Sequence, residues 1–351
     1  MLIPLLLPAL QALHGLNAAQ TGVIASADMV GAAIAAVSVP VWLKRVGPRR
    51  GSSAGLVILI LAALATLMAH SFFLLAISRV IAGLGAGMVL SSGVTVVSMS
   101  LKPARMISAI QVLQLLVAGA ALSGTGRLLA SAGLGAVLSL VALISLLSIP
   151  AAFLLPGASA DTSNRAAVFA DFRPSIPVLI GILLYFTSVG TLTNYAGSLG
   201  LQHGLGLSVT GFVLAFGMLG GLPGSAIASF AESGRREIAA LIGASGVQAI
   251  AIVIILNEKS AFSFAAAYLV IQACITIIAP LQVSALVKRD QSGRAIEGLA
   301  AMQLVGQAIG PLAASLFISA IAVDGAYYFG MILVLSSVGL MLTGCRKAVS
   351  A

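Results

Sequence analysis

The chain has 351 residues, of which 60% are hydrophobic and only 8% are charged, and its mean hydropathy is +1.14. A soluble domain carries roughly 25% charged residues, so this composition indicates an integral membrane protein. The net charge of +9 could suggest a nucleic-acid partner, but we expect none, because the basic residues gather in short breaks between apolar runs. The two cysteines and three histidines are scattered, so we expect no disulfide framework, no metal site and no cofactor.

Apolar runs of about 20 residues alternate with short polar breaks along the chain, which is typical of membrane-spanning helices. The longest break, 156–174, divides them into two sets of six. We therefore predict an all-α integral membrane protein of two six-helix bundles, residues 1–155 (the first half) and 175–351 (the second half), joined by a cytoplasmic linker. The twelve runs are 1–13, 21–43, 53–70, 72–99, 106–129, 133–155, 175–197, 208–230, 238–256, 261–287, 296–321 and 325–344.

The basic residues predict the orientation of the chain. If each run crosses once, 15 of the 18 Lys and Arg residues lie on the same side, which also holds the linker and the C-terminus. The positive-inside rule places that side in the cytoplasm. We expect a monomeric, multi-pass protein of the cell (inner) membrane, surrounded by lipid.

An internal repeat relates the two halves. His14-Gly15-Leu16, followed by Thr21-Gly22, recurs as His203-Gly204-Leu205, followed by Thr210-Gly211, so the offset is 189 (203 − 14). Six runs separate the copies, which gives both the same orientation in the membrane. Pseudo-symmetric halves of this kind, related by an axis along the membrane normal, occur in secondary transporters. For the two histidines we favour a turn or capping role over a proton relay.

The first run is shorter than the repeat requires. The offset maps residue 190 onto Met1, so the first ~15 residues of the seventh run have no counterpart. Met1 to about Leu13 covers only ~20 Å of a ~30 Å hydrocarbon core. We expect a truncated first helix, most simply because translation starts upstream; the alternative is a naturally shortened relative that does not transport.

Two motifs carry a family resemblance. Ser78-Arg79-Val80-Ile81-Ala82-Gly83-Leu84-Gly85-Ala86-Gly87 places an arginine and Gly83, Gly85 and Gly87 in an apolar run, and Leu43-Lys44-Arg45-Val46-Gly47-Pro48-Arg49-Arg50 follows the second run. The first resembles the fourth-helix motif of the major facilitator superfamily of secondary transporters. The second resembles the family's basic gate loop, in which the glycine allows a tight turn. Its weaker echo in the second half contains Glu232, Gly234 and Arg235.

The gate loop departs from the family pattern, because Lys44 stands where the family has an aspartate and Pro48 interrupts the basic end. In the family, that aspartate meets the start of the eleventh helix, which here carries Glu297. We call this contact between the gate loop and the eleventh helix the latch. Its charges are expected to be exchanged here, with the basic group on the loop and the acidic group on the helix. We predict that Lys44 or Arg45 lies near Glu297 when the cytoplasmic side is closed.

Asp28 and Arg79 are the charges deepest in the apolar runs, and both belong to the first half. The offset gives Gly217 and Tyr268 as their counterparts. At ~1.5 Å per residue, each lies ~10 Å below the outer end of its helix, so an ion pair is geometrically possible. Isolated charges at that depth are costly and usually functional. We expect a pair at which a proton or the substrate competes, with a fixed structural salt bridge or snorkelling as the alternatives.

Neutral polar residues fill the corresponding part of the second half. The resemblance implies that the first, fourth, seventh and tenth helices line a central cavity, which points to a solute site. The alternative is hydrogen bonding between helices, worth ~0.6 kcal/mol each in membranes. The candidate residues are Thr187, Thr191, Asn194 and Tyr195 in the seventh run, Tyr268, Gln272 and Thr276 in the tenth, and Gln303 and Gln307 in the eleventh.

The resemblance implies a secondary active transporter of a small organic solute that works by alternating access. We expect the transport to be coupled to protons. Its direction, import or efflux, is left open. A transport-incompetent relative or solute sensor is the alternative. A membrane enzyme is disfavoured, because the runs hold no paired carboxylates, metal cluster or activated nucleophile.

Overall fold

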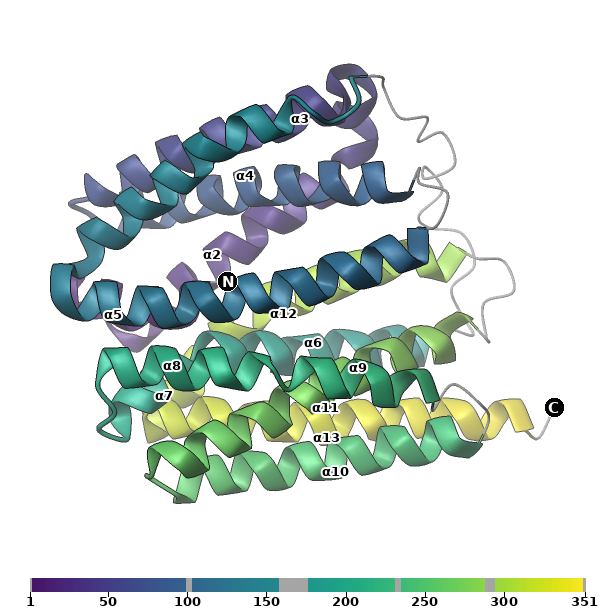
Figure 1. Ribbon diagram of the computed structural model, residues 1–351. Coiled ribbons are helices and arrows are strands. Elements are labelled where there is room, and N and C mark those ends of the chain that lie inside the picture. The colour runs from purple at the N-terminus through teal and green to yellow at the C-terminus, as the bar shows by residue number, and fades with distance from the viewer. Residues whose placement is uncertain (1, 99–102, 158–175, 231–234, 288–293, 350–351) are drawn as a thin grey trace.

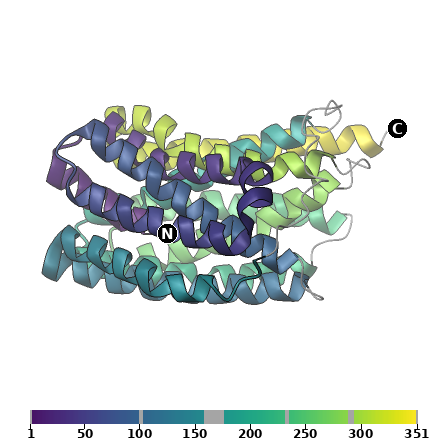
Figure 2. The same ribbon diagram turned by 90° about the horizontal axis from the view of Figure 1, so that it is seen from above.

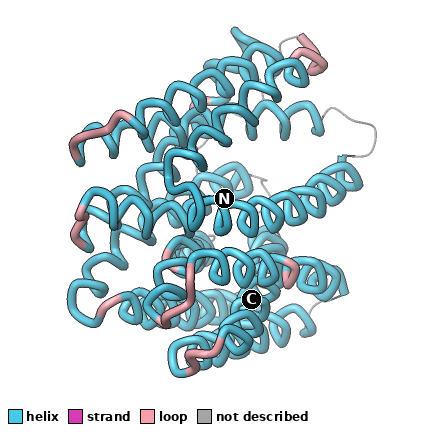
Figure 3. The backbone as a smooth tube through the Cα atoms, turned by 60° about the vertical axis from the view of Figure 1, so that its left-hand side comes forward, coloured by secondary structure: helices cyan, strands magenta, loops and turns pink. Residues whose placement is uncertain are grey.

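The computed structural model describes residues 2–98, 103–157, 176–230, 235–287 and 294–349, and these form helices joined by short loops, with no strand among them (Figure 3). The helices of both halves lie along one common direction (Figures 1 and 2). They are α1 (Ile3–His14), α2 (Ala18–Val37), α3 (Val39–Leu67), α4 (Phe72–Ser98), α5 (Pro103–Ala152), α6 (Ile176–Asn194), α7 (Ala196–Gln202), α8 (Leu207–Met218), α9 (Gly221–Phe230), α10 (Arg235–Asn257), α11 (Ala261–Val287), α12 (Arg294–Ile321) and α13 (Val323–Val349).

Two of the helical segments contain a break at a glycine. Gly47 in α3 has φ 74° and Gly133 in α5 has φ 76°, a backbone conformation that residues with a Cβ rarely adopt. At Gly133 the chain turns back, so that α5 supplies two antiparallel helices (Figure 1). The tight turn predicted at Gly47 and the separate fifth and sixth runs are both confirmed.

The described part of the chain contains 10 candidate membrane spans, and the 41-residue span Val112–Ala152 is the one that turns back at Gly133. The 12-residue α1 is too short to be counted among them. Large apolar side chains such as Leu154, Phe262 and Phe230 are 87%, 83% and 81% exposed, as suits contact with lipid rather than water. The predicted all-α membrane architecture of two six-helix bundles is confirmed.

Two predicted runs are interrupted in the structure. The seventh run ends as α6 at Asn194 and resumes after Tyr195 as α7, while the eighth divides into α8 and α9 around Gly220. Pro223 lies in the first turn of α9, where its missing backbone N–H removes no hydrogen bond. The residues around Gly220 are as apolar as their neighbours, so hydropathy does not detect that break, whereas the break after α6 falls at the polar residues Asn194 and Tyr195.

The two halves repeat the same helix contacts. An added Cβ on Gly31 of α2 would overlap the carbonyl oxygen of Val80 on α4, and one on Gly220 would overlap the carbonyl oxygen of Leu269 on α11. Gly31 and Gly220 are related by the 189-residue offset, and so are Val80 and Leu269. The glycines let the backbones of the paired helices touch, which fixes their packing in each bundle.

Small residues also join the two halves. An added Cβ on Gly22 of α2 would lie 2.6 Å from Cβ of Ser315 on α12, and one on Gly126 of α5 would lie 2.9 Å from Cα of Gly211 on α8. The first turn of α1 meets α7 at Gly197, where a Cβ would overlap the carbonyl of Pro4. The pairs α2–α12, α5–α8 and α1–α7 thus hold the bundles together.

The single tryptophan lies at the bend between α2 and α3. Its indole N–H donates to the carbonyl of Ala35, at 3.1 Å, across the bend at Ser38. The ring packs over Gly51, where an added Cβ would lie 2.5 Å from Cζ3 of Trp42. Trp42 therefore ties the end of the second span to the part of α3 that follows the Gly47 turn.

Candidate functional site

Asp28 of α2 and Arg79 of α4 form a buried ion pair through Oδ2 and Nη2. Asp28 is 9% exposed and Arg79 is 7% exposed. The contact predicted from their equal depth is confirmed. The pair is not fully satisfied, since Asp28 Oδ1 and Arg79 Nε are buried and have no hydrogen-bond partner among the described residues.

The glycines of the fourth-helix motif bring these two side chains together. An added Cβ on Gly83 would overlap the backbone carbonyl of Asp28, and one on Gly87 would lie 2.7 Å from Cβ of Ala35 on α2. Gly85 faces α3 instead, where its Cβ would lie 2.7 Å from the carbonyl oxygen of Gly55. Arg79 thus extends from a helix held against α2 on one side and α3 on the other.

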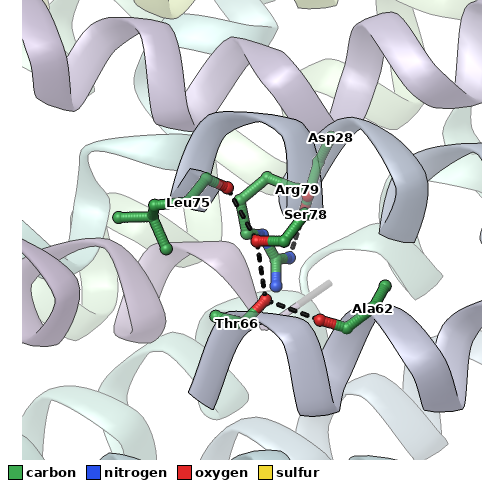
Figure 4. A network of polar contacts seen from close by, with 6 residues as sticks. All are labelled: Asp28, Ala62, Thr66, Leu75, Ser78 and Arg79. Carbon is green, nitrogen blue, oxygen red and sulfur yellow. Dashed lines mark hydrogen bonds and ion pairs between the residues drawn. The ribbon is translucent and has the colours of Figure 1, made fainter. Parts of the chain in front are cut away.

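Two hydroxyl groups beside the pair were missed by the sequence analysis. Thr66 Oγ1 and Ser78 Oγ lie 3.0 Å apart, so one hydroxyl donates to the other, and each also lies within hydrogen-bond distance of a carbonyl of its own helix, Ala62 and Leu75 respectively (Figure 4). This contact fixes α4 against α3 one residue before Arg79. The repeat could have revealed it, because the offset replaces Thr66 and Ser78 by Ile255 and Ala267 in the second half.

A cavity of about 200 Å³ opens beside the ion pair. Asp28, Arg79 and Gly83 line it, and the other lining residues are apolar or small and come from α1 to α5. They are Leu2, Ile3, Leu6, Met29, Ala32, Leu59, Ala63, Ala82, Ala86, Leu138 and Val141. The lining of the cavity therefore consists of one ion pair and an otherwise apolar surface.

The second half closes the corresponding place with an aromatic ring. Tyr268 is 1% exposed, and its ring fills the space that a Cβ on Gly217 would need. Its hydroxyl accepts a hydrogen bond from Gln272, at 2.8 Å. The same pair of positions is thus ionic and open to a cavity in the first half, and neutral and packed in the second.

Most of the predicted solute residues of α6 use their polar groups within the protein. Thr187 donates to the carbonyl of Leu183, Thr191 to that of Thr187 and Asn194 to that of Gly190, each four residues back. Tyr195, after α6, donates to the carbonyl of Pro311 on α12, at 3.1 Å. These contacts match the alternative of hydrogen bonding within the bundle, and a role in solute binding stays a prediction.

The remaining predicted solute residues lie on α11 and α12. Thr276 donates to the carbonyls of Gln272 and Ala273, and Gln303 and Gln307 are half-buried. The backbone of Gln307 packs on Gly190, where a Cβ would lie 2.5 Å from its carbonyl oxygen. None of these residues lines the cavity beside Asp28 and Arg79.

The gate-loop residues are described only in part. Arg45 and Arg50 are exposed, and Arg49 Nε donates to the carbonyl of Leu155, at 3.0 Å, at the end of the first half. Glu232 and Gly234 lie outside the described residues, as do the side chains of Lys44, Arg235 and Glu297. The predicted latch between Lys44 or Arg45 and Glu297 stays a prediction.

Two pseudo-symmetric helical bundles, the first of which holds a buried ion pair and a cavity, are the architecture of membrane transport proteins. The described residues hold no group of His, Cys, Asp and Glu side chains that could bind a metal ion. The sequence profile of the Major Facilitator Superfamily matches residues 1–296, and the chain belongs to this family. The transporter resemblance of the two motifs is thereby confirmed.

Solved structures of similar fold agree with this assignment. A bacterial homologue of the iron transporter ferroportin in an inward-facing state is 16% identical, with a TM-score of 0.73 over 97% of this chain and 93% of that one. The nucleoside transporter NupG is 12% identical, with a TM-score of 0.78 over 98% and 94%. The xylose transporter XylE from E. coli, in a partially occluded inward open conformation, is 13% identical, with a TM-score of 0.73 over 97% and 92%. At these identities the likeness shows the fold alone, and no curated protein matches in sequence.

Proposed function

We propose that the protein is a secondary transporter that moves a small organic solute by alternating access and couples its movement to protons through Asp28 and Arg79. One observation carries this proposal: a buried, incompletely satisfied ion pair faces a cavity. A purely structural salt bridge would be expected to satisfy all its polar atoms, because each buried unpaired atom costs about 1–3 kcal/mol. A pair that leaves an acceptor and a donor free is suited to exchanging partners.

The contacts between the halves support alternating access. The α2–α12 and α5–α8 interfaces include close contacts at Gly22, Gly126 and Gly211, where a Cβ would not fit without a shift of its neighbours. Two bundles joined in this way can rock about a site between or beside them. The charge distribution supports a cytoplasmic linker and C-terminus in the inner membrane, and we propose a monomer as the functional unit.

Reconstitution into liposomes tests the proposal. We expect solute flux that accelerates when a pH gradient is imposed, and we expect Asp28→Asn to remove the acceleration. Arg127→Gln is the matched control, because Arg127 is exposed and does not line the cavity. Normal flux and pH dependence in Asp28→Asn would rule out the coupling role, and absence of flux for every solute tested would favour a transport-incompetent relative.

A further inference from the structure

We propose that the cavity beside Asp28 and Arg79 binds a small monocarboxylate with an apolar body, together with one proton. The inference deepens the proposed function and rests on it for the transport step. It starts from the two free atoms of the pair, Asp28 Oδ1 and Arg79 Nε. The side chain of Arg79 is 9% exposed and that of Asp28 is 12% exposed, and both line the cavity.

The charge balance of the site selects the sign of the ligand. Arginine keeps its proton at any accessible pH, whereas a carboxylate can take one up. Asp28 can therefore become neutral and leave one positive charge for one anion. A bound cation would leave the site with an uncompensated positive charge, and a dianion would leave an uncompensated negative charge even after Asp28 is protonated. Either is costly in a buried site. Among charged ligands, only a monoanion that binds with one proton keeps the site neutral.

The free atoms select the chemical group. One oxygen of a ligand carboxylate accepts hydrogen bonds from the Arg79 guanidinium, including Nε–H. Asp28 takes up one proton from the aqueous phase, which forms an O–H bond on Oδ1, and this O–H donates a hydrogen bond to the other ligand oxygen. Both atoms left idle in the ion pair are then used.

A neutral amide could also offer one donor and one acceptor, but it would not require an ionised pair. The second half shows that the fold packs this place without charge, with Gly217 and Tyr268. Burying the ion pair in the first half costs free energy. Such a pair is suited to a charged ligand that replaces one of its two members as the partner of the other.

The cavity limits the size and polarity of the ligand. Its volume of about 200 Å³ exceeds the ~150 Å³ of an engineered cavity that binds benzene, so one aromatic ring or a short alkyl chain with a carboxylate fits. The wall beyond the pair is apolar, from Leu2 and Leu6 on α1 to Leu138 and Val141 on α5.

No other ionisable side chain lines the cavity in the described part of the chain. The charged or titratable groups on the elements packed around it are His14 on α1, Arg45, Arg49 and Arg50 on α3, and Arg127 on α5, none of them in its lining. The side chains of Lys44, Lys102, Arg105, Arg294 and Glu297, and residue Met1, lie outside the described part. A proton taken up with the ligand is therefore assigned to Asp28.

The test is calorimetric binding of benzoate to the purified full chain over a range of pH. We expect Kd to rise about tenfold for each pH unit, and titration in buffers of different ionisation enthalpy to give about one proton taken up per benzoate. Benzamide, benzylamine and phthalate carry the same ring with no charge, a positive charge and two negative charges. We expect each to bind at least roughly tenfold more weakly. These measurements need no variant.

Variants then assign the atoms. In Asp28→Asn, benzoate should still bind, but without pH dependence or proton uptake. In Arg79→Gln, affinity should fall roughly a hundredfold or more. The doubly neutral Asp28→Asn/Arg79→Gln protein, which has no unpaired buried charge, shows whether a loss of benzoate affinity in a single variant reflects misfolding. Arg127→Gln should bind benzoate as the unaltered chain does.

Several outcomes would overturn the inference: a Kd that is independent of pH, equal binding of benzamide or benzylamine, or no binding of benzoate. The outcomes separate the two proposals. Proton-driven flux of another solute that depends on Asp28, without benzoate binding, leaves the proposed function standing and removes the substrate class. Proton-linked benzoate binding without flux leaves the monocarboxylate site standing and removes the proposed transport function.

Discussion

Tyr268 lies against Gly217 in the second half at the two positions that Arg79 and Asp28 occupy in the first half. One bundle carries an ion pair at this place, and the other carries a buried ring over a glycine. The two bundles thus share a packing scheme but differ in chemistry. Two further polar positions beside the pair also differ, since Thr66 and Ser78 are replaced by Ile255 and Ala267.

Gly217→Ala should destabilise the second bundle, because its Cβ would overlap the Tyr268 ring. Overpacking of this kind typically costs about 1–3 kcal/mol. Thermal unfolding in detergent measures the change. Gly243→Ala on α10 is the control, since its Cβ would meet nothing within 4 Å. Equal melting temperatures for the two variants would show that the ring moves aside freely.

Neutralising one member of the ion pair should cost more stability than neutralising both. Asp28→Asn or Arg79→Gln alone leaves a buried charge unpaired, a loss of about 3–5 kcal/mol. The double variant removes both charges and should recover part of that loss. A double-mutant cycle of unfolding free energies measures the coupling, and additive effects would mean that the pair is not energetically linked.

Gly83→Ala should separate α4 from α2 and weaken the ion pair. Its Cβ would overlap the carbonyl of Asp28, and backbone cannot move aside as a flexible side chain can. We expect a loss of about 1–3 kcal/mol and several-fold slower transport. Gly93→Ala, on the same helix with nothing within 4 Å of its Cβ, should stay within roughly 1 kcal/mol of the unaltered chain. Unimpaired Gly83→Ala would contradict the packing argument.

Stability should decline in mildly acidic solution because of His203, which ends α7 in the loop before α8. Burial lowers the pKa of His203, with Asp324 opposing this effect and Lys259 reinforcing it. Its Nδ1 is buried and has no hydrogen-bond partner in the described ranges of the chain, and the ring packs edge-on against Phe264. The folded protein then binds a proton there less readily than the unfolded chain does. The stability is fully present above the unfolded pKa of ~6.5 and is lost as the pH falls toward the folded pKa.

His203→Gln should flatten this acid decline in a series of unfolding measurements over pH. His14→Gln, at the equivalent position of the first half, is the matched variant. If the decline persists unchanged in His203→Gln, another group is responsible.

The latch prediction is tested by charge exchange. Lys44→Glu and Glu297→Lys, each alone, should place like charges together when the cytoplasmic side closes and should slow transport. The combined exchange should restore much of the rate. Because such pairs are screened by salt, the difference should shrink at high ionic strength. A double variant as slow as the slower single one would remove the latch.

The fold was accessible from the sequence because lipid leaves few alternatives to helices, and hydropathy marks them. The turn at Gly47 and the Asp28–Arg79 contact followed from glycine, charge and helical depth, and the gap between the runs 106–129 and 133–155 predicted two separate helices there. The hydrogen-bond partners of the polar residues on α6 could not be predicted in this way. Thr187, Thr191 and Asn194 share a polar pattern whether they face a solute or donate to their own helix, and only the neighbouring helices decide between these. The partner of Tyr195 is a backbone carbonyl 116 residues away, and no local sequence pattern specifies it.

The position of Trp42 gives the protein a built-in optical probe. Since the chain contains one tryptophan, its intrinsic emission comes from a single place, the bend between α2 and α3. The indole donates to Ala35 and packs over Gly51, and the hydroxyl oxygen of Ser92 would also lie 3.0 Å from a Cβ on Gly51. Any rearrangement of the gate loop changes the polarity and quenching around this ring, so fluorescence reports on it without an added dye.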